Sequence, residues 1–136
     1  MLEIFDLLVP FFEDVYKPIS VREYGRKVKL SPPTASLTLA RLKKEGLLLS
    51  NKQGIYLWYR ANREHFLFQG LSRLYWQQCL FELTEKLHLQ VLFKKIILFG
   101  SLSKAENTLD SDLDLYIDLN KKYLNVAILE KKLHRK

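Results

Sequence analysis

Two closely spaced helix starts constrain the fold of this 136-residue chain more than any other feature of its sequence. Ser20 and Glu23 have the spacing of a capping box, in which the hydroxyl and the carboxylate each satisfy a free backbone amide. Ser31 precedes Pro32, and proline at the first position of a helix gives up no hydrogen bond. The spacing therefore predicts one short helix over about 21–29 and a second helix that begins after Ser31.

The second of these helices has a regular apolar stripe. Ala35, Leu39 and Leu42 recur at the i, i+4, i+7 spacing that places side chains on one helical face. We expect the small, polar and basic side chains at its other positions to face away from the core. An apolar segment over about 2–14 predicts a further helix that packs on this pair. Two short helices joined by a tight turn form a helix-turn-helix pattern.

After these helices the apolar spacing changes to that of strands. Leu47–Ser50 and Ile55–Arg60 predict two strands around the turn Asn51–Gly54, which ends in glycine. Because the hairpin directly follows a helix-turn-helix, we interpret it as a wing, and an ordinary structural hairpin is the alternative. The expected fold class is α+β, with a winged helix of three helices and a hairpin over residues 1–62.

Basic residues are concentrated in the same part of the chain. The net charge of the whole chain is +7, and residues 17–44 alone hold eight basic side chains against the single acid Glu23. The charge of this segment thus equals the charge of the whole protein. A basic cluster that coincides with a helix-turn-helix favours a polyanionic partner over a merely solvated surface.

Residues 1–62 resemble the winged helix-turn-helix domains of MarR-like transcriptional regulators. The similarity rests on the Ser-Pro-Pro-Thr-Ala-Ser turn at 31–36 and on the Leu-x-x-Glu-Gly-Leu ending at 42–47. It implies that the helix beginning at Ser31 enters the major groove of double-stranded DNA. The implied DNA-binding residues are Arg22, Arg26, Ser31, Pro33, Thr34, Ser36, Leu37, Arg41, Lys43, Lys44 and Lys52.

These residues have different implied roles. Thr34 and Ser36 would hydrogen-bond base edges or phosphates, and Arg41 would pair with guanine or a phosphate. The other basic residues of the two helices would contact phosphates, which gives affinity without sequence information. Lys52 would touch the DNA backbone or the minor groove from the tip of the wing. A winged helix used for protein contacts is the alternative function for this part of the chain.

Residues 63–88 predict a long connecting or dimerisation helix, from about Arg63 to Leu87. Its apolar surface is wide and rich in aromatic residues, whereas a surface helix of a monomer needs only one apolar stripe. Either packing against a second domain or dimerisation explains such a surface. We expect a homodimer with Phe68, Tyr75 and Trp76 as its anchors.

Residues 89–136 form the third predicted unit, in which one strand ends in Gly-Ser and a second strand carries aspartates. Ile96–Phe99 predicts a short buried strand that ends in Gly100-Ser101. The second strand has an apolar face of Leu113, Leu115 and Ile117 and a polar face of Asp112, Asp114, Tyr116 and Asp118. Two carboxylates on one face repel each other, and this repulsion favours a shared divalent cation.

This pattern resembles the opening signature of the minimal nucleotidyltransferases of the polymerase-beta-like superfamily. The residues in register are Gly100, Ser101, Asp110, Ser111, Asp112, Asp114 and Leu115. The resemblance implies that Gly100, Ser101 and Ser111 bind a nucleoside triphosphate. It also implies that Asp112 and Asp114 bind Mg²⁺ as the catalytic carboxylates. The implied chemistry is in-line attack on an α-phosphate with the help of two metal ions.

The sequence departs from this family at two points. Lys104-Ala105 stands where the family often has Arg-Gly. The family also draws a third carboxylate from a later strand, whereas residues 120–136 predict a helix, after which the sequence stops. We therefore expect either a fragment of a longer protein or an incomplete nucleotidyltransferase fold that binds Mg²⁺-nucleotide weakly.

Together these features predict a DNA-binding transcriptional regulator with a nucleotidyltransferase-like domain. An active nucleotidyltransferase and an antitoxin-type partner that nucleotidylates a toxin protein are the alternatives. The single cysteine, Cys79, excludes a disulfide framework within the chain. The acidic N-terminus is unlike a signal peptide, and no stretch reaches the roughly 18 apolar residues of a membrane span. We expect a cytoplasmic protein with no membrane partner.

Overall fold

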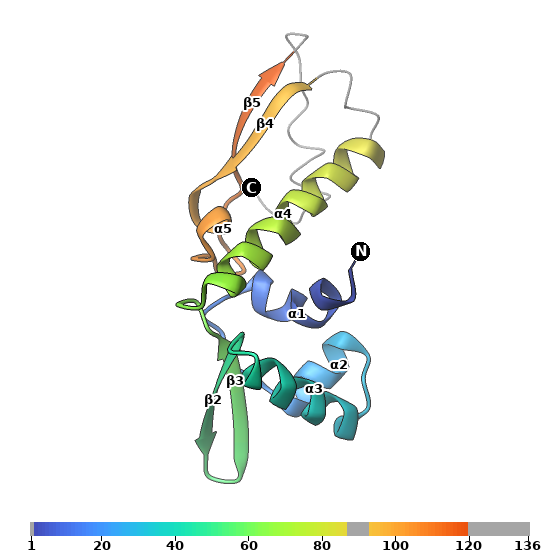
Figure 1. Ribbon diagram of the computed structural model, residues 1–136, viewed down its shortest axis with the longest axis vertical. Helices are drawn as coiled ribbons and strands as arrows, with labels where there is room; N and C mark the ends of the chain where they lie inside the picture. The colour runs from blue at the N-terminus through green and yellow to red at the C-terminus, as the bar shows by residue number, and fades with distance from the viewer. Residues whose placement is uncertain (1, 87–92, 120–136) are drawn as a thin grey trace.

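The computed structural model describes residues 2–86 and 93–119, which form an α+β fold (Figure 1). Its helices are α1 (Glu3–Glu13), α2 (Val21–Val28), α3 (Pro32–Lys44), α4 (Phe66–Lys86) and α5 (Gly100–Lys104). Its strands are β1 (Ile19–Ser20), β2 (Leu48–Gln53), β3 (Tyr56–Ala61), β4 (Phe93–Phe99) and β5 (Asp114–Leu119). The long helix α4 leads from the end of the molecule with α2, α3 and β2–β3 to the end with β4 and β5.

Helices α2 and α3 begin where the sequence predicts. The Ser20 hydroxyl accepts a hydrogen bond from the Glu23 amide at 3.2 Å, which caps α2. The expected return bond from the Glu23 carboxylate does not form, because this carboxylate pairs with Lys17 at 3.3 Å. Only half of the capping box is therefore present. The predicted stripe of α3 is confirmed, since Ala35, Leu39 and Leu42 are all buried.

The hairpin is longer and its turn tighter than the sequence predicts. Strands β2 and β3 pair antiparallel as far as Gln53 and Tyr56, so that Gly54 and Ile55 alone form the turn. Gly54 has a φ of +60°, and positive φ at the first residue of a two-residue loop matches the right-handed twist of the strands. The predicted four-residue turn was thus wrong. Lys52 lies within β2, opposite Leu57, and not in the turn.

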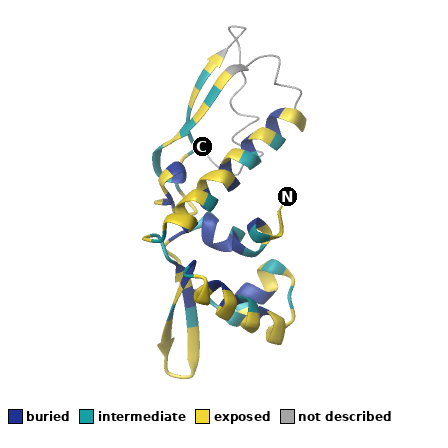
Figure 2. Ribbon diagram, viewed as in Figure 1, coloured by how far each residue is buried: buried dark blue, intermediate teal, exposed yellow. Residues whose placement is uncertain are grey.

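The hydrophobic core crosses all three predicted units. It contains Phe11 and Phe12 of α1, the α3 stripe, the buried face of α4, Leu102 of α5 and Ala105 directly after α5. Figure 2 shows this buried material as a band along α1 and the adjoining face of α4. Because the side chains form one continuous cluster, α1 serves as the common support for both ends of the molecule.

The aromatic residues predicted to anchor a dimer are instead part of this core. Phe68, Tyr75 and Trp76 are all buried within the chain. Phe12 lies between two of them, with ring centroids 5.5 Å from Phe68 and 5.1 Å from Tyr75. The wide apolar surface of α4 is explained by its contact with α1 and α5, so the three predicted anchors were wrong.

Polar contacts also join the two ends of the chain. The Asn107 side-chain amide donates to the carbonyl oxygens of Phe12 and Glu13, at 2.8 and 3.0 Å. Arg63 donates from Nε to the carbonyl oxygen of Ala105 at 2.9 Å. These bonds hold the loop after α5 against the C-terminal end of α1 and the segment before α4.

Strands β4 and β5 pair antiparallel, with α5 between them in sequence. The expectation of a buried strand at Ile96–Phe99 was wrong, because Ile97 is 40% and Phe99 50% exposed. The described sheet has two strands, and its alternate side chains point to solvent while Ile96 and Leu98 are half-buried. The helix predicted over 120–136 lies outside the described residues.

Candidate nucleic-acid interface and candidate nucleotide site

The outer face of α3 is open to solvent. Leu37 lies opposite the buried stripe and is 73% exposed. Pro33, Ser36 and Lys44 are also exposed, and Figure 2 shows α3 exposed along most of its length. Pro33, Ser36 and Leu37 thus lie on the free surface that the sequence predicts for them.

Exposed basic side chains occur on α3 and on the elements that contact it, α2 and β2. Arg22, Arg26, Lys43, Lys44 and Lys52 are exposed, and none of them forms an ion pair within the described part of the chain. Helices α2 and α3 and strand β2 supply them. Unpaired cations from three elements around one exposed helix make a surface suited to a polyanion.

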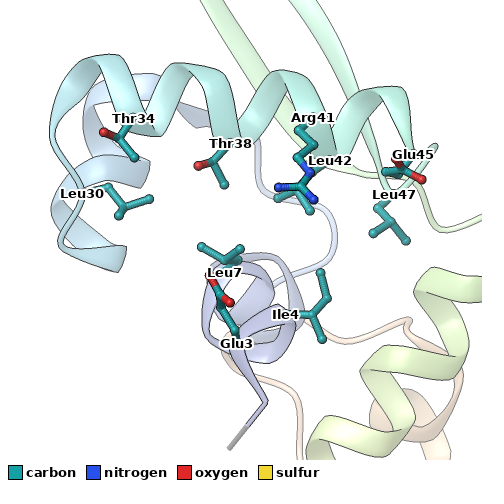
Figure 3. A pocket seen from close by; sticks show the side chains of 10 residues that line it. All are labelled: Glu3, Ile4, Leu7, Leu30, Thr34, Thr38, Arg41, Leu42, Glu45 and Leu47. Atoms are coloured by element: carbon teal, nitrogen blue, oxygen red, sulfur yellow. The ribbon is translucent and has the colours of Figure 1, made fainter.

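Arg41 and Thr34 lie at the edge of the free face of α3 that is nearer to α1. Both line a cavity of about 420 Å³ between α3 and α1, and Figure 3 shows the Arg41 side chain directed toward α1. Thr34 also shares a hydrogen bond of 2.8 Å with the Ser31 hydroxyl. Ser31 and Thr34 are therefore partly satisfied within the chain, and Arg41 lies at the edge of the free face.

The hairpin adds an apolar surface that sequence reasoning missed. Ile55 in the turn is 86% exposed, and the neighbouring Tyr56 is also exposed. A second cavity, of about 490 Å³, lies between this tip and the start of α2, lined by Ser36 of α3, Arg22 and Ile55 among others. The Gly-Ile pair at 54–55 was a usable sequence signal, because glycine at the first position of a two-residue turn places the next residue in the turn and not in a strand.

At the other end of the molecule, Gly100 and Asp114 are in close contact. Phe99 and Asp114 are partners in the β4–β5 register, so β5 begins beside the end of β4. Gly100 has a φ of +71°, and a Cβ added there would lie 2.7 Å from Cγ of Asp114. Only glycine lets this carboxylate approach the backbone so closely. The structure thus brings two residues of the sequence pattern, Gly100 and Asp114, together.

The other predicted residues of this site have varied environments. Asp112 is exposed and lies before β5. The sequence placed Asp112 within the strand, and this prediction was wrong. The Ser111 hydroxyl accepts a hydrogen bond from the Thr108 amide at 2.8 Å, which stabilises the loop before β5. Ser101 is half-buried in the first turn of α5. Ser103, which sequence reasoning missed, donates to the carbonyl oxygen of Gly100 at 2.9 Å and supports the turn.

The donor set fits Mg²⁺ only in part. Carboxylate oxygens are suitable ligands, and the Asp114 carboxylate itself fills the space beside Gly100. Within residues 2–86 and 93–119, no cluster of three or more His, Cys, Asp or Glu side chains is arranged to hold a metal ion. The assignment of Asp112 and Asp114 to a metal ion therefore stays a prediction.

No protein-family model, curated protein or solved structure matches the chain. The resemblances to MarR-like regulators and to minimal nucleotidyltransferases accordingly stay predictions. None of the helices in the described ranges combines the length and the apolar character that crossing a bilayer requires.

Proposed function

We propose that this protein binds double-stranded DNA through α3 and the β2–β3 hairpin and acts as a transcriptional regulator. The observation that supports this proposal best is the set of exposed cations on α2, α3 and β2 that form no ion pair within the described residues. Such a surface attracts the DNA phosphates by long-range electrostatic steering and orients the helix toward the groove.

Within this proposal, α3 reads the major groove mainly with Pro33, Ser36 and Leu37. The Ser36 hydroxyl can donate to or accept from a base edge, and Leu37 can contact the methyl group of thymine. The five cations Arg22, Arg26, Lys43, Lys44 and Lys52 contact phosphates. Because Arg41 lies at the edge toward α1, we assign it a smaller part in base recognition than the sequence alone suggests.

A salt titration tests the proposal. With several phosphate contacts, affinity for a duplex measured by fluorescence anisotropy should fall roughly a thousandfold or more between about 50 and 200 mM salt. Replacing Lys52 by alanine should weaken all sequences alike and lower the salt slope by about 0.9. Absence of duplex binding at low salt, together with capture of a protein ligand by the same face, would favour the protein-contact alternative.

A second function is supported by the contact between Gly100 and Asp114. We propose that a Mg²⁺-bound nucleoside triphosphate binds here, with Gly100, Ser101 and Ser111 toward the phosphates and Asp112 and Asp114 toward the metal ion. Mg²⁺ would neutralise phosphate charge when bound. A further form of this proposal is that the protein transfers the nucleotide to a toxin protein or another acceptor. Transfer requires attack on the α-phosphate in addition to nucleotide binding.

We also propose that the protein is a homodimer, but through a different face of α4 from the one first expected. Leu67, Leu74 and Phe81 are exposed and recur at seven-residue spacing, so they share one side of the helix. Between the first two of them, Gly70 has open space around it. A second copy of α4 could pack along this side, and a dimer would place two α3 helices on one duplex.

A further inference from the structure

The cavity between α1 and α3 combines an apolar lining with charges of both signs. Its volume is about 420 Å³, which is within the usual range for small-molecule sites. Ile4 and Leu7 of α1 face Leu30 and Leu42 across it (Figure 3). These side chains form an apolar surface large enough for a short aliphatic or aromatic group.

The charged groups of this cavity are not neutralised by one another. Arg41, Glu3 and Glu45 all line it, yet Arg41 forms no ion pair with either glutamate in the described structure. A guanidinium binds a carboxylate through two parallel hydrogen bonds, whereas the glutamates attract an ammonium group. A simple anion would meet the two glutamates, and a simple cation would meet Arg41.

We infer that the cavity binds a zwitterion, an α-amino acid with an apolar side chain. Its carboxylate would pair with Arg41, its ammonium group with Glu3 or Glu45, and its side chain would cover the apolar lining. The hydroxyls of Thr34 and Thr38 are further hydrogen-bonding groups on the same wall. This ligand satisfies both signs of charge and the apolar surface at once.

Binding of such a ligand would lower the affinity for DNA. This second step rests on the proposed function, whereas ligand binding itself does not. Arg41 and Thr34 belong to α3 and lie at the edge of its free face, so a ligand that holds them withdraws them from phosphates and bases. The zwitterion leaves the net charge unchanged, but its carboxylate occupies the Arg41 guanidinium that would otherwise attract a phosphate.

The experiment titrates the full chain, free of DNA, with L-leucine and L-phenylalanine by calorimetry or ligand-observed NMR. The matched amine 3-methylbutylamine and the matched acid 4-methylpentanoate serve as probes that lack one charge. We expect saturable binding of at least one amino acid, and binding about tenfold weaker or worse for both probes. Either no saturable binding of any compound at millimolar concentration, or equal binding of acid and amino acid, overturns the inference.

Variants test the assignment to this cavity. Arg41→Gln should weaken the amino acid about tenfold or more, because it loses the charge-assisted pair. Arg60→Gln is the matched control, since Arg60 is an exposed arginine of β3 outside the cavity, and it should leave ligand affinity unchanged. Equal effects of the two variants contradict the assignment. Circular dichroism confirms that both variants fold.

Anisotropy with labelled duplex then separates the two parts of the inference. The amino acid should reduce DNA affinity in the native chain and have no effect in Arg41→Gln. If the chain binds the ligand but DNA affinity does not change, the regulatory step is wrong. If the chain binds no DNA at all, the proposed function fails, while the titration of the free protein still decides whether the cavity takes an amino acid.

Discussion

The side-chain amide of Asn107 caps the end of α1, where it donates to the carbonyl oxygen of Phe12 at 2.8 Å. The last carbonyl groups of a helix have no donor within the helix, and a second bond of 3.0 Å reaches the next such group at Glu13. In return, the backbone carbonyl of Asn107 accepts from the amide of Val15 at 3.1 Å. A residue beside the candidate nucleotide site thus stabilises the first helix of the candidate DNA-binding unit.

Replacement of Asn107 by alanine should lower the free energy of unfolding by roughly 1–3 kcal/mol. Asn107 is fully buried, so its loss leaves two helix-end carbonyls without their donor and opens a small cavity. Chemical denaturation measures the change. Asn51→Ala on the exposed strand β2 is the control and should stay within about 0.5 kcal/mol of the native chain. Equal stability of both variants would show that the cap contributes little.

Replacement of Gly100 by alanine should cost about 2 kcal/mol or more of stability. An alanine would have to adopt a φ of +71° while its Cβ overlaps the Asp114 carboxylate. Gly70→Ala is the opposite case, because Gly70 lies within α4 with open space around it and should gain roughly 0.5–1 kcal/mol. Thermal melts of the two variants should therefore shift in opposite directions. A shift of both in the same direction contradicts the close approach at Gly100.

Much of this fold can be read from the sequence because the relevant signals are local. The cap at Ser20, the proline at 32 and the α3 stripe lie within a few residues of the structure they specify. By contrast, the direction of the Arg41 side chain depends on the position of α1, which is far away in sequence.

The aromatic face of α4 illustrates the same limit. Its composition indicates that the helix buries a wide surface, but composition does not tell whether the covering partner is a second copy or another part of the chain. Here Phe5 and Phe12 of α1 cover Tyr75. Whether α4 packs against α1 or against a second copy depends on contacts between residues some sixty positions apart in sequence, such as Phe12 and Tyr75. A single sequence contains no periodic signal for such contacts.

Alkaline pH should destabilise the protein through Tyr24. Burial raises the pKa of Tyr24 to about 12 from 10.0, and its hydroxyl donates to the carbonyl oxygen of Leu7 at 2.9 Å. Below pH 10 both folded and unfolded chains keep this proton. Between pH 10 and about 12 the unfolded chain loses it first, so stability falls by up to about 1.4 kcal/mol per pH unit.

Comparison with Tyr24→Phe isolates this contribution. Denaturation at pH 8, 10 and 11 should give the native chain a steeper loss of stability than Tyr24→Phe. The variant should be less stable at pH 8 by about 1 kcal/mol, because the hydrogen bond to Leu7 is gone. Identical pH dependence of the two proteins would refute the role of Tyr24.

Leu74→Glu should convert the proposed dimer into a monomer. Leu74 is the middle residue of the exposed stripe, and a charge there would be desolvated in any contact between two α4 helices. Light scattering at tens of micromolar protein measures the mass. Leu49→Glu on exposed β2 is the control and should remain dimeric. A native chain with the mass of one 16.1 kDa copy would rule out the homodimer.

Asp114→Asn should weaken the binding of Mg²⁺-ATP more than Asp118→Asn does. Asp114 lies against Gly100 at the start of β5, whereas Asp118 is exposed further along the same strand. Two carboxylates leave most of the six positions of Mg²⁺ to water, so even the native affinity should be weak. Asp112→Asn should resemble Asp114→Asn if both residues hold the ion, and calorimetry with Mg²⁺-ATP measures all three variants.

The same variants test whether the two proposed functions use separate surfaces. Strand β5, which begins at Asp114, lies toward the other end of the molecule from the hairpin and α3 (Figure 1). Loss of Asp112 or Asp114 should therefore leave the affinity for duplex DNA unchanged. A weaker nucleotide complex with normal DNA binding supports two independent sites. Loss of DNA binding in Asp114→Asn would instead indicate coupling through α1, whose end is held by Asn107 from the loop that precedes β5. Equal nucleotide affinity in Asp114→Asn and Asp118→Asn would contradict the assignment of Asp114 to the metal ion.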